Sequence, residues 1–192
     1  MTGLFTFILF GSLVGLANAA GEDDLVKSIP GLLFNINFKV YSGYLNANQN
    51  GTWKLHYMLT ESRTDPANDP LLFWFNGGPG CSSFSGSFEE LGPFYINSDG
   101  TTLFENVYSW NQHANVLYLE SPVGTGFSYY TNNPNYSVAN DDQTRDQNYY
   151  ALKDFFTNVQ PKYKNKPFFL SGESYAGLNL PSKINSSLIT QK

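Results

Sequence analysis

The chain has 192 residues, of which 17% are aromatic and 14% are charged, and its formal net charge is −5. A chain this rich in aromatic side chains can bury a core and lacks the high net charge of disordered segments, which excludes an intrinsically disordered chain. Its 11 Lys and Arg residues are scattered, so they form no basic patch, and a nucleic-acid-binding protein is also excluded.

Residues 1–20 are predicted to be a signal peptide. The segment carries no charged side chain, residues 4–16 are almost wholly apolar, and Ala17-Asn18-Ala19 supplies the small-x-small pattern that precedes signal cleavage. The apolar run is too short to span a bilayer comfortably, which disfavours an uncleaved membrane anchor, and no later stretch could span one. We therefore expect residues 21–192 to form one exported domain with no membrane span.

In an exported protein, three Asn-x-Ser/Thr sequons become candidate glycosylation sites, at Asn50, Asn135 and Asn185. Each marks a surface loop if it is glycosylated. The single cysteine, Cys81, is unusual in an exported protein, where cysteines are normally paired. It predicts a partner in another chain or in a segment beyond this one, and a buried free thiol is the alternative.

Four segments have the pattern of strands and one has the pattern of a helix. Residues 54–60 are predicted to form a strand, and short apolar runs at 71–75, 115–120 and 167–171 predict buried strands. Residues 141–160 predict a helix whose core face carries Tyr149, Leu152, Phe156 and Val159. A strand, a helix and a strand in this order imply a right-handed crossover and parallel pairing, so an α/β fold with a mostly parallel sheet is expected.

The segment Gly172-Glu173-Ser174-Tyr175-Ala176 directly follows the last predicted strand. A serine with small residues two positions away on each side, at the end of a buried strand, is typical of the nucleophile elbow of α/β hydrolases. Such a turn leads into a helix N-terminus, whose backbone N–H groups can face an oxyanion. The sequence therefore predicts Ser174 as the nucleophile and the Tyr175 N–H as an oxyanion-hole donor.

A second loop, Asn76-Gly77-Gly78-Pro79-Gly80, follows the buried strand at 71–75. Hydrolases of this architecture take another oxyanion N–H from a glycine-rich loop after an earlier strand, which makes the Gly78 N–H a candidate donor. A simple tight turn is the alternative, and glycines alone do not exclude it.

Residues 74–83 (WFNGGPGCSS) resemble the signature of the serine carboxypeptidase family, which includes lysosomal cathepsin A. Residues 89–94 (EELGPF), 120–129 (ESPVGTGFSY) and 172–177 (GESYAG) resemble its other blocks, in the family's order. The resemblance extends from about residue 32 to residue 181. It implies the α/β-hydrolase fold and the removal of C-terminal residues from peptides through an acyl-enzyme on Ser174.

The resemblance also implies that Asn76, Gly77, Glu90 and Glu173 bind the terminal carboxylate of the substrate. Two carboxyl groups can bind an anion only when they are protonated and donate hydrogen bonds, so we expect binding that weakens as the pH rises. That preference suits a lysosome-like compartment, and an extracellular location is the other expectation. No metal or cofactor is implied, and a homodimer of a full-length form is left open.

The partners that would activate Ser174 are not found in the expected order. In α/β hydrolases an acid and then a histidine follow the serine, but the 18 residues after Ser174 contain no Asp, Glu or His. His56 and His113 lie upstream, and structural or surface roles are expected for both. The chain is therefore interpreted as the N-terminal part of a serine carboxypeptidase, with little or no turnover by itself.

Two residues are also compared with the family pattern, and one strand carries a structural expectation. Cys81 matches a position that family members pair with a downstream cysteine. Asn179 stands where an aromatic residue is more usual. The strand at 167–171 is expected to leave an exposed hydrophobic edge.

Two other functions remain open at this point. One is an inactive secreted binding protein. The other is a serine esterase or acyltransferase, which would use Ser174 without needing the pair Glu90 and Glu173.

Overall fold

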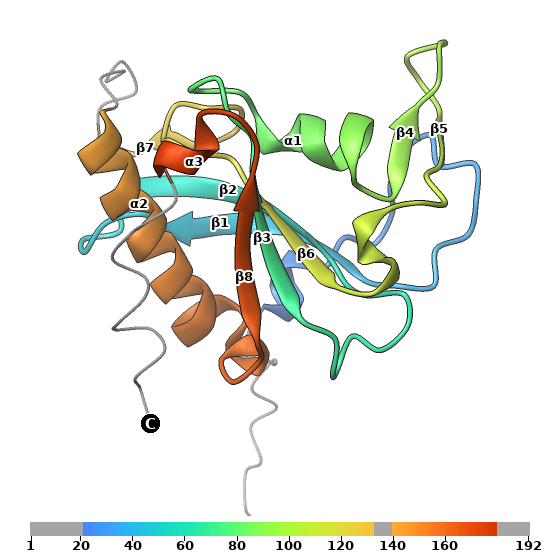
Figure 1. The fold of residues 1–192 in the computed structure, drawn as a ribbon, viewed down its shortest axis with the longest axis horizontal. Helices are drawn as coiled ribbons and strands as arrows, with labels where there is room; N and C mark the ends of the chain where they lie inside the picture. The colour runs from blue at the N-terminus through green and yellow to red at the C-terminus, as the bar shows by residue number, and fades with distance from the viewer. Residues whose placement is uncertain (1–20, 133–139, 180–192) are drawn as a thin grey trace, which may run out of the picture.

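The computed structural model describes residues 21–132 and 140–179, which are built around a six-stranded mixed sheet (Figure 1). The predicted signal peptide and the sequons at Asn135 and Asn185 lie outside the described residues. The strands in spatial order are β1 (Val40–Asn46), β2 (Trp53–Thr60), β6 (Asn115–Leu119), β3 (Leu71–Phe75) and β8 (Phe168–Gly172), and β7 (Tyr129–Tyr130) pairs with the start of β2.

The sheet is parallel on one side and antiparallel on the other. Strands β6, β3 and β8 run parallel, whereas β1 and β2 are antiparallel to each other and β2 is antiparallel to β6. The predicted strands at 71–75, 115–120, 54–60 and 167–171 are confirmed to within one residue at each end. β6 and β8 are parallel as expected, but they are not neighbours, because β3 lies between them.

One face of the sheet is covered by the helix α2 (Asp141–Asp154), which continues through a π-helical turn, Phe155–Val159 (Figure 1). The helix begins where Asn140 caps it, since the Asn140 side chain accepts a hydrogen bond from the Gln143 N–H. Leu152 and Phe156 are buried against the sheet, as the helical spacing predicted, and Tyr149 and Val159 pack at the edge of the same cluster.

The opposite face carries a second core beneath a short helix and a hairpin. The helix α1 (Ser83–Ser85) continues into a π-helical turn, Gly86–Glu90, and the hairpin joins β4 (Phe94–Ile96) to β5 (Leu103–Glu105). Successive side chains of β6 point to opposite faces of the sheet and so enter different cores. Leu117 and Leu119 lie in the core on the α2 side, and Val116 and Tyr118 lie in the core on the hairpin side. The described structure also contains the short helix α3 (Ala176–Asn179) and three 3₁₀ turns. These turns are η1 (Glu22–Asp24), η3 (Trp110–Gln112) and η5 (Pro161–Tyr163).

Strand β8 forms an edge of the described sheet, paired only with β3 among the described residues. Phe169 on this strand is 57% exposed, so the expected hydrophobic edge is present among the described residues. None of the helices in residues 21–132 and 140–179 is long and apolar enough to cross a membrane.

Candidate active site

Ser174 lies on the sharp turn between β8 and α3. Its φ angle is +53°, which makes it the one non-glycine residue with a positive φ among the described residues. This left-handed conformation is strained for a residue with a Cβ and persists only where the surroundings impose it. The turn is dense: a Cβ on Gly172 would lie 2.6 Å from the Phe75 carbonyl oxygen and 2.7 Å from the Cβ of Ala176. The small residues flanking the serine are therefore required by close packing.

The glycine-rich loop after β3 packs directly against this turn. A Cβ on Gly77 would lie 2.8 Å from the Glu173 carbonyl oxygen and 2.9 Å from both the Ser174 Cβ and the Tyr175 nitrogen. The two predicted oxyanion donors, the N–H groups of Gly78 and Tyr175, therefore come from adjoining loops. Neither N–H donates a hydrogen bond to another described residue, so both are free to donate to a ligand.

Glu90 and Glu173 come from different parts of the chain and meet at one amide group. The Asn76 Nδ2 donates hydrogen bonds to Glu90 Oε1 at 2.9 Å and to Glu173 Oε1 at 3.2 Å. Glu90 ends the π-helical turn after α1, and Glu173 follows β8. Both side chains are exposed, whereas Asn76 is buried. The structure therefore brings together the four residues expected to bind a carboxylate: Asn76, Gly77, Glu90 and Glu173.

Asn76 is itself held in place on both its side chain and its backbone. Its Oδ1 accepts a hydrogen bond from the Trp74 indole nitrogen at 2.8 Å, which leaves the Nδ2 facing the two carboxyl groups. Its backbone N–H donates to the Ser83 hydroxyl at 3.1 Å, and that hydroxyl donates to the Leu119 carbonyl at 2.7 Å. The amide is thus oriented before any ligand arrives.

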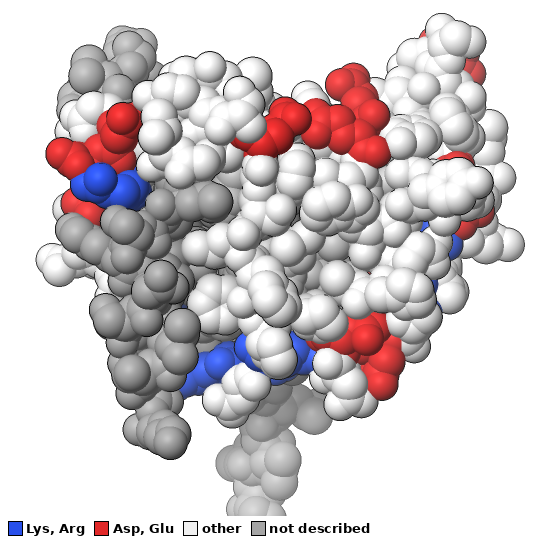
Figure 2. All heavy atoms as spheres, viewed as in Figure 1, with Lys and Arg blue, Asp and Glu red and all other residues white. Residues whose placement is uncertain are grey.

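The rim around this site is acidic. Figure 2 shows Asp and Glu side chains gathered along the upper edge of the molecule, above the region where α1 and the end of β8 lie in Figure 1. Glu89, Glu90 and Glu173 are all exposed. The phenol of Tyr175 points to the start of α2, where it donates to Asp141 at 2.9 Å, and this hydrogen bond raises the pKa of Tyr175.

Glu120 is a buried structural residue of this region for which no role was predicted from the sequence. Its side chain is buried and accepts hydrogen bonds from the Ser82 hydroxyl, from the Phe127 N–H at 2.8 Å and from His56 Nδ1 at 3.0 Å. Burial raises the pKa of the Glu120 carboxyl, but the hydrogen bonds from His56, Ser82 and Phe127 outweigh it, and the net pKa is lowered. A carboxylate that directly follows the apolar run 116–119 was the sequence signal for it.

This carboxylate ties the glycine-rich loop to two other segments. Ser82 caps α1 at the end of the loop, and Phe127 lies in the loop that leads to β7. Gly126 has a φ of +53°, which strains any other residue, and a Cβ there would lie 1.9 Å from Glu120 Oε1 and would displace the carboxylate. Glu120 therefore fixes the loop that carries Gly78.

The two histidines lie in different surroundings. His56 is buried, with Nδ1 on Glu120 and Nε2 on the Ser42 hydroxyl at 2.9 Å. His113 is exposed at the end of η3. The structural and surface roles expected for them agree with these positions.

Cys81 and Asn50 are both at the surface. The Cys81 thiol is unpaired among the described residues and exposed rather than buried. Asn50 is exposed in the turn between β1 and β2, and its Oδ1 accepts a hydrogen bond from the Thr52 hydroxyl at 2.8 Å. No group of three or more His, Cys, Asp and Glu side chains in the described part of the chain could hold a metal ion.

Comparison with known proteins shows which family the chain resembles. The serine carboxypeptidase family profile matches residues 30–192. A serine carboxypeptidase of Caenorhabditis elegans, ctsa-3.1, is 65% identical over 169 residues, which are 88% of this chain and 29% of that protein. The lysosomal protective protein of Mus musculus is 49% identical over 164 residues, covering 85% of this chain and 34% of its own length.

A solved structure has a similar fold. Kex1Δp, a prohormone-processing carboxypeptidase from Saccharomyces cerevisiae, matches with a TM-score of 0.71 and 27% identity over 83% of this chain and 37% of its own. The chain thus spans about a third of the length of these relatives. The expected α/β-hydrolase fold is confirmed, with the described residues forming part of it. The chain belongs to the serine carboxypeptidase family.

Proposed function

We propose that this chain carries the nucleophile and the carboxylate-binding site of a serine-type carboxypeptidase, an enzyme that releases C-terminal amino acids from peptides. The observation that carries the proposal is the Asn76 amide that joins Glu90 and Glu173 beside the strained turn of Ser174. A general esterase has no need of a second recognition site for a free carboxylate. This pair is therefore what distinguishes a carboxypeptidase from other hydrolases with the same turn.

The proposed reaction uses the two loops together. The Ser174 hydroxyl attacks the carbonyl of the last peptide bond, and the N–H groups of Gly78 and Tyr175 stabilise the oxyanion that forms. The amide of Asn76, the backbone of Gly77 and the protonated carboxyl groups of Glu90 and Glu173 hold the terminal carboxylate. The amino acid then leaves, and water releases the peptide from the serine.

Attack by the serine hydroxyl requires a base, and this requirement limits the turnover expected of these 192 residues on their own. Both ring nitrogens of His56 are already engaged, by Glu120 and Ser42, and His113 lies at the surface. We therefore expect a polypeptide of these 192 residues to bind peptides with little or no turnover. We also infer a location in the secretory pathway, lysosomal or extracellular, with Asn50 as a glycosylation site.

A binding experiment tests the carboxylate site without depending on turnover. A blocked dipeptide with a free C-terminal carboxylate and the same dipeptide with a C-terminal amide are titrated into the chain by calorimetry at pH 4.5 and pH 7.5. We expect the free acid to bind at least about tenfold more tightly than the amide at pH 4.5, because charge-assisted hydrogen bonds are stronger. Equal affinity for acid and amide would contradict the proposal.

Matched variants test the two carboxyl groups. Because glutamine donates hydrogen bonds at any pH, the double variant Glu90→Gln and Glu173→Gln should bind the free acid equally well at both pH values. Glu105→Gln, in β5, is the control and should keep the pH dependence of the wild type.

A second assay measures release of the C-terminal amino acid from the same dipeptide. Robust release that is abolished by Ser174→Ala would support the carboxypeptidase assignment but contradict the expected inactivity of the chain alone.

A further inference from the structure

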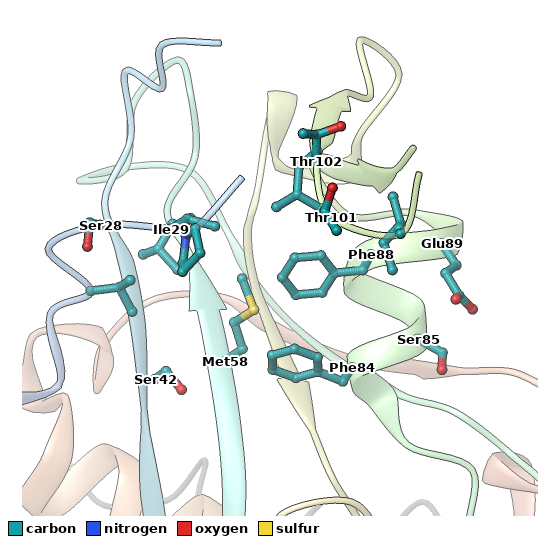
Figure 3. Close-up of a pocket in the computed structure, with 16 residues that line it drawn as sticks. Ser28, Ile29, Ser42, Met58, Phe84, Ser85, Phe88, Glu89, Thr101 and Thr102 are labelled. Carbon is teal, nitrogen blue, oxygen red and sulfur yellow. The ribbon is translucent and has the colours of Figure 1, made fainter. Parts of the chain in front are cut away.

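A separate pocket opens on the hairpin side of the sheet, and Ser174 is not part of it. It has a volume of about 540 Å³ and lies between the segment before β1, the strands β1 and β2, the helix α1 with its π-helical turn, and the hairpin (Figure 3). Val40, Met58, Phe84, Phe88 and Leu103 make its walls largely apolar. In Figure 3, Phe84 and Phe88 point toward Met58 across the space. An apolar pocket of this size with a few oriented polar groups is typical of a small-molecule site.

The polar group on the sheet side of the pocket is the Ser42 hydroxyl, and its hydrogen-bonding role is determined by buried neighbours. Ser42 Oγ lies 2.9 Å from His56 Nε2, and His56 Nδ1 lies 3.0 Å from Glu120 Oε2. Ionised Glu120 can only accept, so Nδ1 carries the ring proton. In the neutral ring Nε2 is then an acceptor, and Ser42 must donate to it. With the ring in this tautomer, the Ser42 oxygen presents only lone pairs to the pocket.

The order Ser42, His56, Glu120 is that of a catalytic relay, but the surroundings of Ser42 favour binding over nucleophilic attack. Ser42 lies in the middle of β1, opposite Met58 in the antiparallel ladder. An oxyanion hole needs converging backbone N–H groups of the kind found at the turn of Ser174 and not along an extended strand. The relay thus orients an acceptor at the wall of the pocket.

The charges around the pocket exclude an acidic ligand. No Lys, Arg or His lines it, and the charged residue at its rim is Glu89, which is exposed. Beside Ser42 a carboxylate head would meet an acceptor, with an acidic side chain at the rim, and an ammonium head would lose its hydration in the apolar interior. A hydroxyl head can donate to Ser42 at little desolvation cost.

We propose that this pocket binds an apolar molecule with a hydroxyl group, which donates its hydrogen bond to Ser42. The residues that line this pocket include neither Ser174 nor the pair Glu90 and Glu173.

The test uses 1-octanol, octylammonium and octanoate, which share an eight-carbon chain and differ in the head group. Met58 lines the pocket and is one of two methionines in the sequence, so its ¹³C-labelled methyl group gives a site-specific NMR signal. At pH 8 we expect 1-octanol to shift this signal saturably and to bind at least about tenfold more tightly than octanoate, whose head group would be unpaired. Octylammonium should also bind more weakly than the alcohol.

Variants test the role of the serine. Ser42→Ala should weaken 1-octanol binding by about 3- to 10-fold, the usual contribution of one neutral hydrogen bond, and Ser42→Thr should restore it. Ser85→Ala, which removes a hydroxyl elsewhere in the same pocket, and Ser174→Ala should leave the affinity within about twofold. The methyl spectrum without ligand shows whether each variant is folded.

Three results would overturn the proposal. They are a Met58 signal that does not respond to 1-octanol, octanoate binding as tightly as the alcohol, and a folded Ser42→Ala variant with wild-type affinity.

Discussion

A methyl group added to Gly77 would lie 2.9 Å from the Cβ of Ser174, closer than real Cβ atoms approach other heavy atoms. The glycine-rich loop and the nucleophile turn therefore pack with no space between their backbones. Two loops that are 97 residues apart in the chain, from Asn76 to Glu173, are packed into one site by this contact.

The contact predicts that Gly77→Ala destabilises the chain. The neighbours are backbone atoms of Glu173 and Tyr175, which cannot rotate away, so we expect a loss of about 1–3 kcal/mol in the free energy of unfolding. Urea denaturation measures it. The control is Gly177→Ala in α3, where an added Cβ meets nothing within 4 Å, and which should be neutral or stabilising by up to about 1 kcal/mol. Equal effects of the two substitutions would contradict the packing argument.

The backbone strain at Ser174 predicts that glycine is tolerated better than alanine at this position. Glycine adopts a φ of +53° without the Cβ clash, so Ser174→Gly should be more stable than Ser174→Ala by about 0.5–1 kcal/mol, after the entropy cost of glycine. The two variants both lack the hydroxyl and differ only in the Cβ. Denaturation midpoints that are the same for both would show that the turn is not strained.

The buried carboxylate of Glu120 predicts a pH-dependent loss of stability. Because its pKa is lower in the folded chain than the ordinary value of 4.5, its ionised form contributes fully above that value. The contribution is lost as the pH falls through the lower, folded pKa. Glu120→Gln should therefore destabilise by about 2 kcal/mol at pH 7 and by progressively less below pH 4.5.

Denaturation curves of both proteins between pH 7 and pH 3 measure this difference. Glu89→Gln, which removes an exposed carboxylate, corrects for the change in net charge. A stability difference between wild type and Glu120→Gln that stays constant with pH would argue against an ionised, hydrogen-bonded Glu120.

The hairpin turn contains a second carboxyl group whose pKa is lowered, that of Asp99. The Thr102 hydroxyl and the N–H groups of Thr101 and Thr102 bind Asp99, and they lower its pKa to about 2. The ionised form therefore supports the turn fully above the ordinary value of 3.8, and this support is lost as the pH falls toward 2. Thr102→Val removes the hydroxyl hydrogen bond that lowers the pKa of Asp99 most, so this pKa should move toward 3.8. The titration is followed by ¹³C NMR of the Asp99 carboxyl carbon. An unchanged titration would show that the hydroxyl contributes little.

The sequence by itself determined the elements and motifs whose signals are local. The strands of apolar residues, the helix from 141 onward and the serine turn all depend on neighbours within a few residues, and each is found where its pattern predicts. The strand β1 was missed because it carries Gly43 and several polar side chains and has no clear apolar run.

Only the tertiary structure decided which distant residues meet. The order of the strands puts β3 between β6 and β8, and this order brings the loops after β3 and β8 together, with Glu90 and Glu173 on the amide of Asn76. The burial of His56 between Ser42 and Glu120 also depends on long-range pairing of β1, β2 and β6. A local pattern cannot specify such contacts, because each depends on how separate segments pack across one sheet.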